Sequence, residues 1–163
     1  MDWNILFNVI VFIVTFFSME FVAWFTHKYV MHGFMWNLHK DHHTGSKHPV
    51  ERNDLFSLIF AIPSCLLIML GLAYQVSAMV WIGAGMTAYG LAYFIVHDIF
   101  IHQRIKLFRN TNSSYFRALR RAHKMHHKHL HKEEGESFGF LIVGKKYFQQ
   151  DNNSLLDKKH GTN

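Results

Sequence analysis

Ten of the fourteen histidines in this 163-residue chain belong to a pattern that is stated twice. The first statement is HKYVMH at 27–32 followed by HKDHH at 39–43; the second is HDIFIH at 97–102 followed by HKMHH at 123–127. The pattern comprises His27, His32, His39, His42, His43, His97, His102, His123, His126 and His127. Imidazole suits zinc, copper, iron and nickel. Ten such ligands exceed what one ion can bind, so the pattern predicts two metal ions with four to five ligands each.

The spacing within each motif restricts how the rings can meet. Residues three and four apart share a helix face, so the three rings of each HxxHH triad are expected to point at one locus. The HxxxxH pairs are five residues apart, and on an ideal α-helix such positions lie well apart around the axis. These pairs suit a helix end, a bulge or two separate metals, and the sequence leaves the three open.

The donor set favours iron and oxygen chemistry. A structural zinc site is usually four-coordinate and closed, whereas two ions with more ligands leave positions open for oxygen. Soluble di-iron bundles use mostly glutamate with a Glu-x-x-His motif, which is absent from this chain. A loose histidine-rich metal-binding tail is the alternative for residues 123–131, and the doubled pattern argues against it. His48, His129, His131 and His160 lie outside the pattern and are interpreted as ordinary surface or core residues.

Three apolar runs must position these motifs. Residues 5–25, 55–74 and 76–96 each approach the ~20 residues that a membrane-spanning helix needs. The short break at 74–76 predicts a helical hairpin, and Gly83, Gly85 and Gly90 allow close helix packing. We therefore predict an all-α integral membrane bundle with a histidine-rich helical cap. It has three spans, or four if the third run breaks near Gly90, and a soluble bundle with three buried helices is the disfavoured alternative.

Charge placement predicts the topology. The formal net charge is +6, and all 17 lysines and arginines lie within residues 28–52 or from 104 onward. Short loops that carry Lys or Arg stay cytoplasmic, so the histidine motifs and the C-terminus are expected inside the cell. A basic balance could also suit nucleic acid, but the apolar runs favour the membrane, and no nucleic acid partner is expected. The single cysteine, Cys65, excludes an intramolecular disulfide and a cysteine-based metal site.

The chain is expected to form one domain over residues 1–148. The first apolar run lacks the basic start and cleavage site of a signal peptide and is expected to be retained. Residues 117–132 are basic and compatible with a helix. Residues 149–163 are polar and rich in Asn and Lys, which predicts a disordered tail.

The four histidine motifs resemble the histidine boxes of the fatty acid hydroxylase and sterol desaturase superfamily. The segments between them are similar to the bacterial β-carotene hydroxylases over roughly residues 20–143. Matching stretches are HKYVMHG at 27–33, NDLF at 53–56, WIGAGMTAYGLAYFIVHD at 81–98, IHQR at 101–104 and SFGFL at 137–141.

That resemblance implies an enzyme with two non-haem iron ions that uses O2 and electrons from a reduced ferredoxin. It implies hydroxylation of the β-ionone rings of carotenoids, from β-carotene through β-cryptoxanthin to zeaxanthin, in the bacterial inner membrane. The ten motif histidines are then the metal ligands. Acids that could support them through the second ring nitrogen are Asp41, Asp98, Glu51, Asp54 and Glu20. The basic residues Arg117, Arg120, Arg121, Lys124 and Lys128 could dock an acidic ferredoxin or contact anionic lipid.

Two alternatives remain at this stage. A fatty acid or sterol hydroxylase, or a desaturase, of the same superfamily would share the metal site and differ in its substrate pocket. A membrane metal carrier or sensor would not be an enzyme, and it would place ligands along a transmembrane path. The histidines instead gather outside the apolar runs, which favours the hydroxylase.

Overall fold

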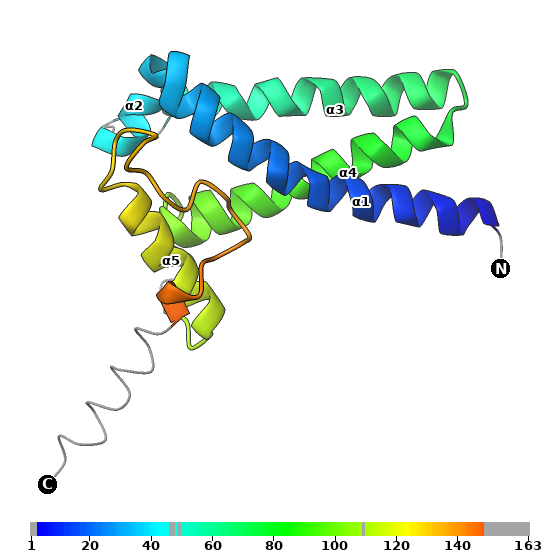
Figure 1. Cartoon of the computed structure of the whole chain (residues 1–163). Helices are drawn as coiled ribbons and strands as arrows, with labels where there is room; N and C mark the ends of the chain where they lie inside the picture. The colour runs from blue at the N-terminus through cyan, green and yellow to red at the C-terminus, as the bar shows by residue number, and fades with distance from the viewer. Residues whose placement is uncertain (1–2, 46–47, 49, 109, 149–163) are drawn as a thin grey trace, which may run out of the picture.

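The computed structural model describes residues 3–45, 48, 50–108 and 110–148, and every regular element within them is helical (Figure 1). The elements are α1 (Trp3–Phe25), the π-helical segment η1 (Thr26–Phe34), α2 (Trp36–Thr44), the 3-10 turn η2 (Arg52–Asp54), α3 (Leu55–Ala73), α4 (Ser77–Tyr93), the π-helical segment η3 (Phe94–Ile101) and α5 (Ser114–His126). The all-α prediction is confirmed. The predicted single domain stays a prediction, and the predicted tail at 149–163 lies outside the described residues.

Three helical stretches are long and apolar enough to cross a membrane: Trp3–Phe34, Arg52–Ala73 and Ser77–Ile101. The second and third form the predicted hairpin, and Gln75 takes a left-handed φ of 56° in its turn. Gly90 lies inside an unbroken α4. The described residues therefore contain three membrane-capable helices, and the fourth span considered for a break near Gly90 does not form.

Helix α4 lies between α1 and α3 because two of its glycines permit close approach. A Cβ on Gly83 would lie 2.7 Å from the carbonyl oxygen of Ser64 on α3. A Cβ on Gly85 would lie 2.9 Å from the carbonyl oxygen of Phe12 on α1. Gly90 is different, since an added Cβ there meets nothing within 4 Å, and this residue lines a cavity instead. The predicted packing role thus holds for two of the three glycines.

The cap lies at one end of the bundle, where α2 and α5 cover the histidine-bearing ends of the long helices (Figure 1). Helix α5 begins before the expected residue 117 and ends at His126, short of the expected residue 132. The chain turns after His126, and the Leu130 carbonyl accepts a hydrogen bond from the His32 ring at 3.0 Å. The Arg120 guanidinium donates to the Phe100 carbonyl at 2.9 Å and stacks on the Phe100 ring. The first contact joins the segment after α5 to the end of the first span, and the second joins α5 to the end of the third span.

Candidate metal centre

The first HxxxxH pair lies within η1, and the second begins within η3 and ends at its C-cap residue, His102. The His102 amide donates to the His97 carbonyl at 2.9 Å, which is an i to i+5 hydrogen bond. Such a bond places the fifth residue one turn above the first, so the two rings share a face. The ring centroids are 4.5 Å apart for His97 and His102, and 5.1 Å apart for His27 and His32. Of the three explanations that the spacing left open, the structure selects a local bulge.

The ten motif histidines gather into two adjacent groups. The ligand nitrogens of the first cluster, which lie within 4.8 Å of one another, belong to His27, His32, His39, His43 and His126. Those of the second cluster, within the same limit, belong to His42, His97, His102 and His123. His127 places its Nε2 atom 2.9 Å from Nε2 of His123, and we count it with the second cluster. The clusters meet where the rings of His43 and His127 stack, with centroids 4.2 Å apart.

Each HxxHH triad is divided between the clusters, so the expectation that its three rings share one locus is wrong. In α2, His39 and His43 belong to the first cluster, while His42 belongs to the second. The reason is helical geometry. At about 100° per residue, the i+3 and i+4 positions fall on opposite sides of the first residue. Helix α2 therefore supplies rings to both clusters. Helix α5 does so too, with His126 in the first cluster and His123 in the second.

The rings of the first cluster present lone pairs to its centre. The Nδ1–H groups of His27, His32 and His126 each donate to a backbone carbonyl at 3.0 Å. A carbonyl can only accept, so the proton lies on Nδ1 and the Nε2 atom of a neutral ring carries a lone pair. The Nε2 atoms of His32 and His126 face each other at 3.2 Å. Two lone pairs at that distance repel unless a cation lies between them, so this donor set fits a metal ion.

The rings are neutral near pH 7. Burial, together with the charge of neighbouring histidines, lowers the pKa of His39 and of His42 to about 3. Burial likewise lowers the pKa of His126 to about 2, with His32 as the next cause. Metal binding requires the neutral imidazole, so these rings need not release a proton before they bind an ion.

The supporting contacts of the second cluster are carboxylates. His42 donates its Nδ1–H to Glu51 at 2.9 Å, and His97 donates to Asp98 at 2.9 Å. The Arg104 guanidinium approaches both acids, at 3.5 Å from Glu51 and 3.9 Å from Asp98. In the first cluster, by contrast, His39 donates to the amide oxygen of Asn53 at 2.6 Å.

The five acids named from the sequence thus divide by position. Glu51 and Asp98 contact the predicted ligands directly. Asp54 lies one step further away, since it accepts from the Arg104 side chain at 2.8 Å and 3.0 Å. Asp41 accepts from the Arg52 amide at 2.7 Å, and the structure gives it no bond to a motif histidine. Glu20 lies in α1 and binds a different segment.

Several supporting groups were not predicted. Asn53 and Arg104 lie in the NDLF and IHQR stretches, and only the resemblance of those stretches singled them out. The carbonyl oxygens of Leu130, Glu136 and Phe138 could not be identified from residue type, because every residue has a carbonyl.

The five basic residues named for docking differ in whether their side chains are bound within the protein or exposed. Arg117, Arg120 and Arg121 direct their guanidinium groups at backbone carbonyls, of Thr111, Phe100 and Tyr147 respectively. Lys124 and Lys128 are exposed. Only these two lysines keep the exposure that a docking contact needs.

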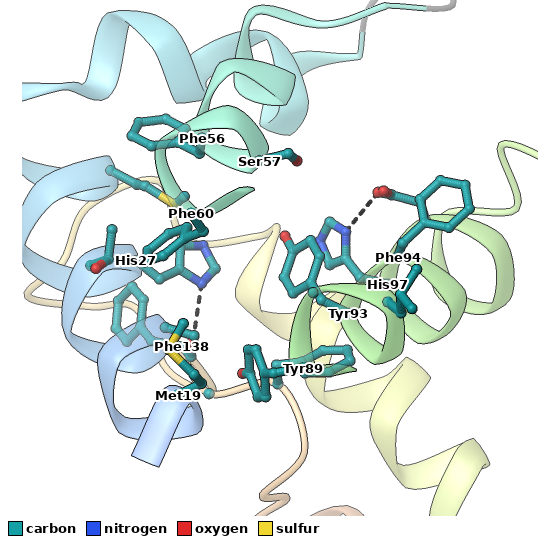
Figure 2. Close-up of a pocket in the computed structure, with 18 of the residues that line it drawn as sticks. Met19, His27, Phe56, Ser57, Phe60, Tyr89, Tyr93, Phe94, His97 and Phe138 are labelled. Atoms are coloured by element: carbon teal, nitrogen blue, oxygen red, sulfur yellow. Dashed lines mark hydrogen bonds and ion pairs between the residues drawn. The ribbon is translucent and has the colours of Figure 1, made fainter. Parts of the chain in front are cut away.

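An apolar cavity of about 340 Å³ leads to the clusters (Figure 2). Side chains of α1, α3 and α4 line it, and His27, His97 and His123 reach it from the two clusters. The Tyr93 ring stacks on His97 with centroids 4.4 Å apart. Small-molecule sites are typically apolar cavities of ~300–1,000 Å³ with a few polar groups. This cavity therefore suits an apolar molecule that presents one end to both clusters.

Comparison with known proteins is consistent with the histidine clusters and the apolar cavity. A family model described as fatty acid hydroxylase matches residues 12–149. This chain belongs to the fatty acid hydroxylase family. Among curated relatives, the β-carotene hydroxylase of Pseudescherichia vulneris is 41% identical over 94% of this chain and 85% of its own length. The β-carotene hydroxylase of Pantoea ananas is 46% identical, with 83% and 77% covered.

The β-carotene hydroxylase of Paracoccus sp. (strain PC1) is 39% identical, with 80% of this chain and 81% of its own length covered. No solved structure matches this chain significantly. The resemblance predicted from the histidine motifs and the segments between them is confirmed. Family membership together with the histidine clusters supports a hydroxylase, an oxidoreductase whose centre can hold metal.

Proposed function

We propose that this protein hydroxylates the β-ionone rings of carotenoids, from β-carotene through β-cryptoxanthin to zeaxanthin. The observation that carries the proposal is the pair of histidine clusters beside an apolar cavity between membrane-capable helices. The names of the relatives supply the substrate class. A carotenoid is wholly apolar, so it dissolves in the bilayer and can present a ring to a site at the end of the spans.

The metal proposed for both clusters is iron, with the ten motif histidines as ligands. When bound, the iron pair supplies the activation of O2, which protein side chains cannot provide. The reaction balances as C–H plus O2 plus two electrons plus two protons, giving C–OH and water. One oxygen atom enters the ring, and the other leaves as water.

The chain's own groups then have separate tasks. The apolar cavity holds the ring and excludes water from the clusters. The Nδ1–H bonds of the ligands fix which nitrogen faces the metal and how each ring is oriented. Tyr93 packs on His97 along the cavity wall and limits how close the substrate ring can approach that ligand.

Electrons are proposed to come from a reduced ferredoxin on the cytoplasmic side. The positive-inside rule, applied to the lysines and arginines, supports that orientation. Lys124 and Lys128 lie exposed at and just beyond the end of α5, which carries ligands of both clusters. Lys124→Glu together with Lys128→Glu should raise the KM for an acidic donor and leave metal content unchanged. An unchanged KM would remove these lysines from the docking surface.

Production of hydroxylated carotenoids in cells that make β-carotene tests the whole proposal. The wild-type chain should yield β-cryptoxanthin and zeaxanthin, and iron should be bound at two ions per chain. His42→Ala should abolish both products while the protein still inserts in the membrane. His48→Ala is the matched control, since His48 is exposed and outside both clusters, and it should retain activity. No gain of either product from the wild-type chain would refute the carotenoid assignment.

A further inference from the structure

One buried carboxylate of the first span belongs to neither cluster. Glu20 is 6% exposed and lies seven residues before His27, which is about 10 Å along the helix axis. It lies within the membrane-capable stretch Trp3–Phe34. Ionisable residues at such depth are costly, and they usually have a functional partner.

The partner of Glu20 is a non-helical segment near the C-terminus, residues 135–143, which we call the strap. One carboxylate oxygen, Oε1, accepts three consecutive backbone N–H groups, from Phe140 at 2.8 Å, Leu141 at 2.7 Å and Ile142 at 3.1 Å. The other oxygen, Oε2, accepts the hydroxyl of Tyr89 at 2.7 Å.

This bonding solves a backbone problem. Non-helical backbone at membrane depth is tolerated only where its polar groups are satisfied inside the protein. The strap has no helical partners for these amides, and one carboxylate satisfies three of them. Phe140 is buried against Met19 and Tyr89, so the strap is fixed against both α1 and α4. A Cβ on Gly139 would lie 3.0 Å from Oε1, so the strap also approaches the carboxylate closely.

The same strap orients two rings of the first cluster. The carbonyl of Phe138 accepts from His27, and the carbonyl of Glu136 accepts from His126, each at 3.0 Å. The Phe138 ring also meets His27 and His126 edge-on, with centroids 5.5 Å and 5.1 Å away. Glu20 is therefore linked through one short segment to two of the five rings in the first cluster.

We propose that Glu20 is a positioning residue: its carboxylate holds the strap, and the strap carbonyls orient His27 and His126. The role of those rings as ligands rests on the proposed function; the anchoring of the strap does not. The sequence named Glu20 as a support that contacts a ligand ring directly; the geometry makes that support indirect, through the strap. Glu20 does not line the apolar cavity beside the clusters; it lines a separate, more open hollow together with strap residues.

Hydrogen exchange and metal content of the purified full-length protein test the proposal together. In Glu20→Ala, the amides of residues 140–142 should exchange about tenfold faster or more, because bonds to a charged acceptor are lost. The variant should also lose the ion of the first cluster and keep that of the second. The Mössbauer spectrum of the iron-loaded protein should then lose one of its components.

Matched variants separate positioning from general damage. Glu20→Gln keeps an acceptor oxygen without the charge, so strap exchange and metal loss should be intermediate. Tyr89→Phe removes only the contact to Oε2, so strap amides should stay protected. Ser18→Ala, at an exposed position of the same helix, should match the wild type in both measurements.

Unchanged strap exchange in Glu20→Ala would overturn the proposal, as would faster exchange with both ions and the spectrum intact. If Glu20→Ala also speeds amide exchange in α3 and α4, the whole bundle is disturbed, and Glu20→Gln becomes the deciding variant. Intermediate strap exchange in an intact bundle supports the proposal, and wild-type exchange refutes it. A wild-type protein that binds no metal would refute the proposed function alone, because the exchange measurement would still test the anchor.

Discussion

The two histidine clusters use the same motifs but are supported by chemically different groups. Rings of the first cluster donate to neutral oxygens, namely three backbone carbonyls and the amide of Asn53. Two rings of the second cluster donate to the carboxylates of Glu51 and Asp98. A carboxylate partner raises the basicity of a ligating imidazole. The second cluster is therefore expected to be the more electron-rich of the two.

The support also comes from different distances along the chain. In the second cluster, Glu51 lies nine residues from His42, and Asp98 is adjacent to His97. In the first cluster, the carbonyl that orients His27 lies 111 residues away, and the one that orients His32 lies 98 away. Equal ligand motifs thus do not produce equal sites, since His27 and His32 of the first cluster depend on distant segments. The supports of His39 and His126, at 14 and 10 residues, are nearly as local as those of the second cluster.

The largest effects should come from removing one ligand from each cluster. His126→Ala removes a fully buried ring from the first cluster, and His123→Ala removes a half-buried ring from the second. Each should lower hydroxylation by more than the ~10–100-fold typical of losing a supporting group, because a proposed metal ligand itself is removed. Metal analysis should show that each variant loses the ion of its own cluster. If both variants lost both ions alike, the clusters would act as one unit and the comparison would fail.

Removal of a supporting charge should have the next largest effect, confined to the second cluster. Glu51→Gln and Asp98→Asn preserve shape and remove the carboxylate, so the affinity of the second cluster for metal should fall about 10–100-fold. Competition with a chelator measures this for each ion. The ion of the first cluster should dissociate as in the wild type, because the rings of that cluster donate to neutral oxygens that these substitutions leave in place. A larger loss from the first cluster would contradict the assignment of support.

Adding a charge to the first cluster should make it resemble the second. Asn53→Asp places a carboxylate beside the Nδ1–H of His39, where an amide oxygen now accepts at 2.6 Å. The spectroscopic component of the first cluster should shift toward that of the second, with a few-fold change in activity. Asn53→Ala is the comparison variant, because it removes the acceptor without adding charge. An identical spectrum in Asn53→Asp would show that the acceptor's charge is unimportant there.

The smallest effect concerns a property that the clusters share. Burial lowers the pKa of His39 in the first cluster and of His42 in the second to about 3, from an ordinary value near 6.5. Between those values the unfolded chain binds protons that the folded chain does not, so stability falls as pH falls. The metal-free protein should therefore melt at progressively lower temperature from pH 6.5 toward pH 3. A melting temperature that is flat over this range would mean that the rings are not held neutral.

Much of the fold follows from local patterns. The apolar runs at 5–25, 55–74 and 76–96 correspond to α1, α3 and α4 because length and hydropathy alone select a spanning helix. The end of α5 was predicted less well, since basic residues up to 132 are compatible with a helix. The chain turns after His126, and the carbonyl of Leu130 then meets His32, a contact that only the assembled cap provides.

Residue types and spacing alone identified the ten histidines and predicted two metal ions, whereas Glu51 and Asp98 were two of five acids named from the resemblance, and only the structure separated them from the other three. Pairing each ring with its cluster required the folded chain. The π-helical turns bring residues five apart onto one face, and each HxxHH helix lies between two clusters. The strap is the clearest case. Its carbonyls and its anchor on Glu20 involve backbone atoms common to every residue, so only three-dimensional proximity distinguishes them.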